Sequence, residues 1–458
     1  MTQEQRSGRP DEDRARVSRV DAPLRGPFLL LFGSAVLWLT LGSALSLVAA
    51  FKLLPAGFGS CEWTSFGRLE AAARNAFFYG WAGNALFALN LWLLSQLGRF
   101  EIRNGWMAAI GGLFWNLALI WSTVSVIISG PGAYALLDFP AGAGQVLAVA
   151  FALAGLWPVV AYAKRPTGHS FAGQWFVVAA AVSFLLAFVL AQVTVVWAPA
   201  AGVAQAVAHS WYVRTATLLW LGGSALGLGY YFVSKVLARP LHAYYLASVA
   251  FWTYFLFAGW TAPASLIGSP VPLWVQSAGV VGSMMMLVPV LLVGLNLLGA
   301  LSQEGGWSRA WNSTALRFIS VGVVAILFSL VLAAWAADRS VNAALRFTSF
   351  AEGQGVLLLY AGVSMTIFGA AYAALPRVSG SRWPSAAAIH THFWASFLGA
   401  VGSAVSAFAQ IGGASQTMAF VGLVSTGLLL AGHLAFAANT FATLLKGSPA
   451  PESHPAQD

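Results

Sequence analysis

The sequence predicts an all-α polytopic membrane protein. Its 458 residues are 59% hydrophobic and only 8% charged, whereas a soluble domain usually carries about 25% charged residues. The apolar residues form long runs of about 20, the length that a helix needs to cross the hydrocarbon core of a bilayer. The net charge of +9 is spread between these runs, which excludes a nucleic-acid-binding patch and is typical of orientation signals.

Twelve such runs in chain order predict twelve membrane-spanning helices in one membrane domain, residues 27–446. Their predicted ranges are 27–53, 75–97, 105–129, 143–163, 172–197, 209–234, 243–267, 272–301, 315–337, 351–375, 386–411 and 417–445. Residues 1–26 carry charges of both signs and lack the apolar core and cleavage site of a signal peptide. We predict that residues 1–26 and the Pro-rich residues 447–458 are disordered cytoplasmic tails.

The distribution of Lys and Arg predicts the orientation. With the N-terminus inside, the predicted cytoplasmic segments hold seventeen of these residues and the outer segments five. Because cytoplasmic loops are enriched in Lys and Arg, both termini are predicted to be cytoplasmic. The single cysteine, Cys61, excludes an intrachain disulfide, and there is no CxxC or CxxCH motif for zinc or a c-type haem.

Ionisable side chains inside a membrane are costly and often functional. Those within the predicted helices or at their ends are Arg214, Glu352, His390, His392 and His433, with His209, His169 and His242 at the outer mouth or near cytoplasmic loops. His433 alone is predicted to lie deep in the bilayer, which favours a hydrogen-bonded core histidine over a metal ligand. His390 and His392 fall on opposite faces of a helix and cannot bind one metal together, so we predict a structural or interfacial role for them.

Arg214 and Glu352 leave two interpretations each. The side chain of Arg214 either extends to the outer surface or points into the bundle, where Glu352 is the nearby carboxylate at the right depth. Glu352 is explained by its position at a helix N-terminus, with a proton relay as the alternative. Arg214, Glu352 and His433 are the polar residues expected in the interior. The residue pattern alone defines no catalytic group.

Several sequence words then identify a resemblance. WYVR at 211–214 and YYFVSK with ARP at 230–240 resemble WYGH, YYFVPK and GRP of the catalytic subunit (subunit I) of the cbb-type, or C-family, haem-copper oxidases. RNAFFYGWAGNALF, WTAPAS, PVPLWVQSAG, GQGV, GAAYAALPR and HTHFW resemble further words of that family. The resemblance covers most of the chain and implies a twelve-helix haem-copper oxidase subunit I-like bundle in the bacterial inner membrane.

The resemblance also implies that every metal ligand of the family is replaced. The positions of the low-spin haem ligands hold Ala73 and Val356, and that of the high-spin haem ligand holds Gln354. The three copper-ligand positions hold Arg214, Ala264 and Ser265, and the redox tyrosine position holds Ala258. Since Ala, Val and Ser cannot coordinate iron or copper and Gln is a poor haem ligand, we expect no haem b, no copper and no oxygen reduction by the family's mechanism.

Losing two haems would leave a destabilising void. Either the many Trp and Phe side chains have collapsed into it, or a lipid tail, quinone or other apolar ligand occupies it beside Arg214. Three functional hypotheses follow: a non-catalytic scaffold or subunit of a respiratory or electron-transfer complex, that is, a pseudoenzyme with a degenerate active site; an oxidase or nitric oxide reductase-like subunit with haem held by other histidines, such as His433 and His390; or a proton, ion or small-solute channel with Arg214 and Glu352 along its path.

Overall fold

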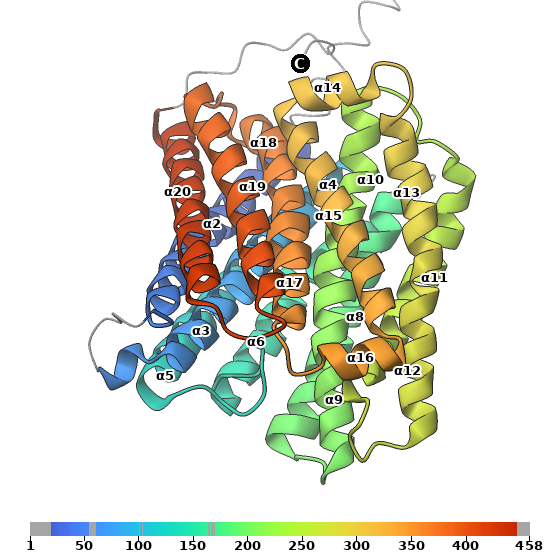
Figure 1. The fold of residues 1–458 in the computed structure, drawn as a ribbon. Helices are drawn as coiled ribbons and strands as arrows, with labels where there is room; N and C mark the ends of the chain where they lie inside the picture. Colours follow the sequence, from blue (N-terminus) through green and yellow to red (C-terminus); the bar gives the residue numbers. More distant parts are fainter. Residues whose placement is uncertain are drawn as a thin grey trace, which may run out of the picture.

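The computed structural model describes residues 20–54, 61–99, 101–102, 104–163, 165 and 170–446. This part of the chain is all helical and contains no strand, as the composition predicts, and its long helices run side by side (Figure 1). Helix α2 (Arg25–Phe51) and the short turn η1 (Ala22–Leu24) begin within the last residues of the predicted N-terminal tail. The rest of both predicted tails, and His169, lie outside the described residues.

Eleven helical segments of the described chain are long and apolar enough to cross a membrane. They are α2; α3 (Phe66–Asn75), η3 (Ala76–Gly83) and α4 (Asn84–Gly98) in one run; α5 (Trp106–Ser129); α6 (Ala141–Ala154) with α7 (Trp157–Ala163); α8 (Ala172–Ala191) with η4 (Gln192–Trp197); α9 (Val203–Arg214), η5 (Thr215–Gly222) and α10 (Gly223–Leu237) in one run; α12 (Leu273–Met285) with α13 (Leu287–Leu301); α15 (Thr314–Ala336); α17 (Phe350–Val356), η8 (Leu357–Ser364) and α18 (Met365–Ser379) in one run; α19 (Ala386–Ala409); and α20 (Gln416–Lys446).

The predicted helix over 243–267 is shorter than the sequence pattern indicated. Its regular part is α11 (Ala247–Trp260), which continues into the 3-10 turn η7 (Ala262–Leu266). Pro263 has no backbone N–H to continue an α-helical ladder, and the Thr261 hydroxyl donates to the Ala258 carbonyl at 2.9 Å. The α-helix therefore ends before the apolar run does, and the turn that follows delivers Ala264 and Ser265 to the bundle interior.

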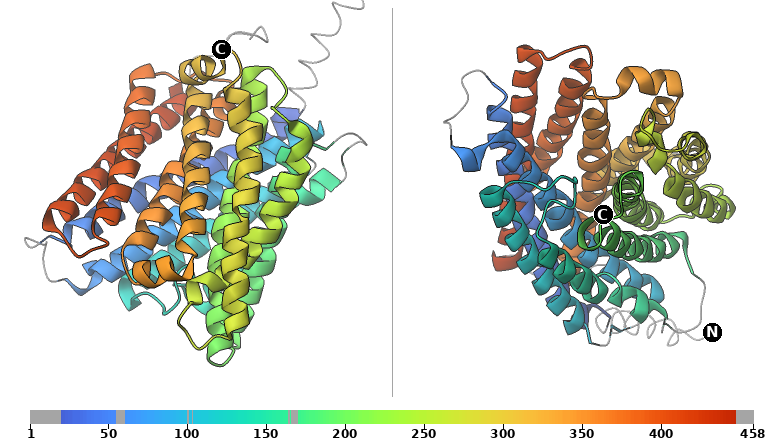
Figure 2. Two further views of the ribbon diagram at one scale, coloured as in Figure 1. Left: turned by 45° about the vertical axis from the view of Figure 1, so that its right-hand side comes forward. Right: turned by 90° about the horizontal axis from the view of Figure 1, so that it is seen from below.

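Three segments form the interior of the bundle. In their most apolar windows, 100% of the residues of Phe66–Gly98, 89% of Val203–Leu237 and 72% of Phe350–Ser379 are buried, against 61% or less in the other eight spans. A helix that is apolar on all sides is suited to such a central place. The peripheral helices complete a closed arrangement in which α20 packs on α2, so that the first and last spans meet (Figure 2).

Candidate functional site

The three interior segments share a departure from α-helical geometry. Each contains an eight-residue π-helical stretch, η3, η5 or η8. These stretches begin within three residues of Ala73, directly after Arg214 and directly after Val356. Since π-helical turns are rare and occur mostly at functional sites, their positions single out the same helices that the family resemblance does.

A cavity of about 190 Å³, which we call the arginine cavity, lies where two of these segments, Val203–Leu237 and Phe350–Ser379, meet η7, α12, α15 and α16 (Arg339–Leu345). Its lining includes four of the seven positions that the resemblance implied, from three separate parts of the chain: Arg214, Ala264, Ser265 and Gln354. Ala73, Ala258 and Val356 do not line this cavity. Sequence words up to 140 residues apart thus converge on one enclosed space.

Arg214 lines the arginine cavity as the last residue of α9 and is half-buried. It makes no hydrogen bond or ion pair with any residue that the structure describes. The pairing with Glu352 that an inward orientation suggested is not formed, and Glu352 is exposed on α17. Arg214 and Glu352 therefore do not form a continuous polar path.

The remaining polar residues at the implied ligand positions are engaged with the protein. The Gln354 amide donates to the Ser329 carbonyl at 3.3 Å, and the Ser265 hydroxyl donates to the Ala262 carbonyl at 2.7 Å. Across the described residues, no group of three or more His, Cys, Asp or Glu side chains could hold a metal ion. A lining of guanidinium, amide, hydroxyl and methyl groups does not fit a haem-copper centre, which needs imidazole ligands.

A second region, which we call the aromatic region, occupies the space between η3 and the η8–α18 segment. Phe77 and Tyr360 stack with ring centroids 3.9 Å apart, and Trp81 stacks on Phe368 at 4.8 Å. The Trp81 indole donates to the Ser364 hydroxyl at 2.9 Å. Phe77 and Tyr360 lie one helical turn beyond Ala73 and Val356, so rings fill the space next to these two positions.

Two histidines come together that the sequence did not link. His392 of α19 and His433 of α20 are buried, and their ring centroids lie 6.4 Å apart. His433 Nδ1 bonds with the Ser43 hydroxyl at 2.6 Å, as expected of a core histidine, and His392 Nδ1 bonds with the Tyr372 hydroxyl at 2.8 Å. His390 is exposed on the opposite face of α19, so His390 and His433 cannot hold one haem.

The His392 ring is enclosed by aromatic neighbours. Phe368 and Phe436 lie 4.3 and 4.7 Å away, centroid to centroid, and the Nε2 atom of His392 has no hydrogen-bond partner. A signal for its burial exists in the sequence: Ser396 and Gly399 follow at helical spacing, and small residues mark helix interfaces in membranes.

The segment 130–140 between α5 and α6 connects one end of two interior segments, at α3 with η3 and at α9. His209 Nε2 bonds with the Ala135 carbonyl at 3.0 Å, and the Tyr79 and Tyr212 hydroxyls bond to each other. The Asp138 carboxylate pairs with Arg74 at 3.0 Å. Burial raises the pKa of Asp138, and Arg74 offsets part of that effect. The remaining described histidine, His242, lies at the other end of the bundle, beside Gln303 at 3.5 Å.

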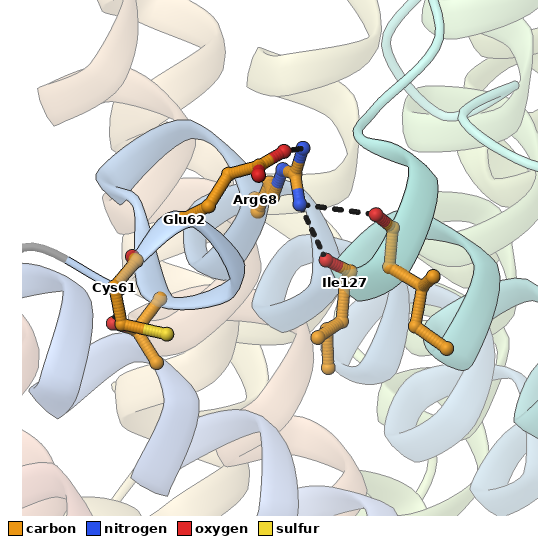
Figure 3. A network of polar contacts seen from close by, with 6 residues as sticks. Cys61, Glu62, Arg68 and Ile127 are labelled. Carbon is orange, nitrogen blue, oxygen red and sulfur yellow. Dashed lines mark hydrogen bonds and ion pairs between the residues drawn. The ribbon is translucent and has the colours of Figure 1, made fainter.

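The segment around Cys61 is folded and attached to the bundle (Figure 3). The Arg68 guanidinium binds the Glu62 carboxylate at 2.6 Å and donates to the Ile127 carbonyl at the end of α5 at 3.1 Å. Cys61 itself is free and exposed. This segment therefore presents an accessible thiol next to the mouth of the bundle.

The all-helical membrane bundle built around three buried segments has the fold of haem-copper oxidase subunit I. A solved structure reported as a heme-copper terminal oxidase dimer superposes with a TM-score of 0.69 over 95% of this chain and 88% of that chain, at 13% sequence identity. At 13% identity, the likeness to this structure shows the fold alone. The family model described as "Cytochrome C and Quinol oxidase polypeptide I" matches residues 27–420, and the chain belongs to this family.

Two curated relatives agree with the resemblance. The chain is 27% identical over 449 residues to the Cbb3-type cytochrome c oxidase subunit CcoN1 of Stutzerimonas stutzeri, covering 91% of this chain and 94% of the relative. It is 26% identical over 455 residues to cytochrome c oxidase subunit 1 of Rhodobacter capsulatus, covering 89% and 83%. The predicted family and fold are confirmed, whereas the loss of cofactors stays a prediction.

Proposed function

We propose that this chain is a non-catalytic member of the family, a cofactor-free membrane scaffold or subunit of a respiratory or electron-transfer complex. The observation that carries the proposal is the lining of the arginine cavity: Arg214, Ala264, Ser265 and Gln354 meet there, and none of them offers an imidazole. A guanidinium is a permanent cation and opposes a metal ion at the same place. The overall bundle is kept, so a role in assembly survives without the chemistry.

Haem and copper content test this proposal. The full-length chain, purified in detergent from cells that supply haem, is expected to give no stoichiometric pyridine-haemochrome signal and no stoichiometric copper by metal analysis. The Stutzerimonas relative, prepared in the same way, is the control for cofactor survival during purification. Stoichiometric haem in this chain would contradict the proposal. It would favour the alternative, an active oxidase or nitric oxide reductase-like subunit with other haem ligands.

The scaffold role requires partners in the same membrane. Proteins that bind the bundle are expected to co-purify after cross-linking in intact cells, and their complex should survive substitution of Arg214 by leucine, since no cavity chemistry is needed. Recovery of the chain alone, without any membrane partner, would contradict the subunit role.

The proposed location is the bacterial inner membrane with both termini cytoplasmic, which places Cys61 on the outer side. Because the chain has one cysteine, a membrane-impermeant maleimide should label Cys61 in intact spheroplasts, and a Cys61→Ser variant is the blank. Labelling that appears only after permeabilisation would show the opposite orientation.

A further inference from the structure

The arginine cavity carries a net positive charge that no carboxylate of its lining balances. Besides Arg214, the lining includes Arg346, which follows α16, and it contains no Asp or Glu. Arginine side chains act as permanent cations in proteins. Two like charges that line one cavity repel each other.

These two arginines differ from others in the described chain. Arg68, Arg74 and Arg377 each contact a carboxylate at 2.6 to 3.0 Å. Arg214 has no hydrogen-bond or ion-pair partner among the described residues. The Nη1 atom of Arg346 is buried without a hydrogen-bond partner, and its guanidinium lies 5.0 Å from the centroid of the Phe347 ring. A buried charge without a partner is costly unless something else pairs with it.

The available donors define the chemistry of that partner. Six other polar side chains of the lining already donate to backbone carbonyls: Thr261, Ser265, Ser283, Asn342, Thr348 and Gln354. The free donors are thus the guanidinium N–H groups, whose planar fork matches the oxygens of an oxyanion. A cavity of about 190 Å³ limits the bound group to the size of a phosphate or sulfate.

We propose that the arginine cavity binds a small oxyanion of the phosphate or sulfate type between Arg214 and Arg346. The oxyanion neutralises both cations where the family resemblance places a copper ion, so the cavity is an anion site rather than a metal site. The same chemistry is offered by a free inorganic anion and by the phosphate of an anionic lipid headgroup.

Calorimetry on the full-length purified chain tests the proposal. In an oxyanion-free buffer of low ionic strength, titration with inorganic phosphate or sulfate is expected to show one saturable site. Arg214→Leu and Arg346→Leu should each weaken it by about tenfold or more, since a charge-assisted hydrogen bond contributes at least that much. The matched control is Arg339→Leu, because Arg339 lies on α16, bonds to Ser277 at 2.6 Å and is outside the cavity.

A second arm distinguishes the lipid source. The chain is placed in phosphatidylcholine nanodiscs with and without phosphatidylglycerol, and thermal stabilisation by the anionic lipid is compared between the wild type and the two leucine variants. If a leucine variant does not fold, Arg214→Lys and Arg346→Lys replace it; these keep the charge but lose the fork and should bind more weakly than the wild type.

The outcomes separate clearly. Arginine-dependent binding of the free salts, or arginine-dependent stabilisation by phosphatidylglycerol, supports the site and names its source. The proposal is overturned if the wild type binds no oxyanion in either arm. It is also overturned if the substitutions at Arg214 and Arg346 leave the binding unchanged. Neither result alters the haem measurement: a chain that lacks haem and binds no oxyanion refutes this inference alone, and a chain that contains haem refutes the proposed function.

Discussion

The aromatic region and the arginine cavity share the interior segment Phe350–Ser379 but differ in what fills them. In the aromatic region, Trp81 is wholly buried and its ring contacts Phe32, Phe368 and Phe436. In the arginine cavity, Arg214 is half-buried beside an open volume of about 190 Å³. One region is thus packed with rings, and the other keeps space and charge.

The difference has a physical basis in the side chains that surround each region. Stacked rings bury large apolar areas and stabilise by their own packing, so the aromatic region needs no ligand. Arginine cannot fill a void in that way, because its guanidinium needs hydrogen-bond acceptors. The aromatic region is what the predicted collapse of Trp and Phe side chains would look like, whereas the arginine cavity leaves room for a ligand.

The largest expected effect is that of Trp81→Ala in the aromatic region. Removing this fully buried ring should lower the free energy of unfolding by about 3–5 kcal/mol, because neighbouring helices cannot close the cavity completely. Titration of detergent-solubilised protein with sodium dodecyl sulfate measures the change. Trp81→Phe, which keeps a ring and loses only the bond to Ser364, is the matched control with a smaller loss. A loss of less than about 1 kcal/mol for Trp81→Ala would mean that the region is not closely packed.

The next largest expected effect is the difference in stability cost between enlarging a side chain at Gly80 and enlarging one at Ala333. A Cβ at Gly80 would lie 2.5 Å from the Trp38 ring, so Gly80→Ala is expected to cost about 1–3 kcal/mol through overpacking. Ala333 lines the arginine cavity, and Ala333→Val should change stability by less than about 0.5 kcal/mol because the added methyl groups enter open space. Equal costs at both positions in the same denaturant titration would erase the distinction between the regions.

Removing the charge of Arg214 from the arginine cavity should stabilise the protein rather than destabilise it. In an oxyanion-free buffer, Arg214→Leu is expected to raise the free energy of unfolding by about 1 kcal/mol, because an unpaired charge is replaced by an apolar side chain. Saturating phosphate should then stabilise the wild type and leave the variant unchanged. A destabilised Arg214→Leu protein would show instead that Arg214 has a favourable protein partner.

Much of the fold could be predicted from the sequence, because the length of apolar runs is set by the thickness of the bilayer. Eleven of the twelve predicted helices are long enough to cross a membrane, and the twelfth, 243–267, is present as the shorter α11, which ends before Pro263 inside the apolar run. The π-helical stretches were not foreseen, since hydropathy does not distinguish a π-helical turn from an α-helical one.

The candidate site was less predictable. The ligand positions came from family words, and periodicity placed His390 and His392 on opposite faces without saying which face was inside. The absence of a bond between Arg214 and Glu352 could not be derived either: a similar depth in two helices says nothing about the rotation of each helix. Contacts between distant helices depend on the packing of both partners, which a single sequence does not display.

The smallest predicted effect concerns the segment 130–140, which contacts α3, η3 and α9. Burial raises the pKa of Asp138, so the folded state holds this proton more tightly than the unfolded state does. The corresponding stability is present below the unfolded pKa of about 4 and is lost as pH rises through the higher folded pKa. Thermal unfolding from pH 4 upward should therefore show a slight loss of stability in the wild type.

Asp138→Asn removes this titration, so the slope of stability against pH should flatten even if the absolute stability falls through loss of the contact with Arg74. The slope is the informative readout, because a half-exposed ion pair contributes little by itself. Tyr79→Phe is the matched control: it breaks the hydroxyl bonds to Tyr212 and to the Leu136 carbonyl without removing the carboxyl group. If Tyr79→Phe flattened the slope as much as Asp138→Asn, the titration would belong to the packing of the whole segment, and the two regions would be coupled through it.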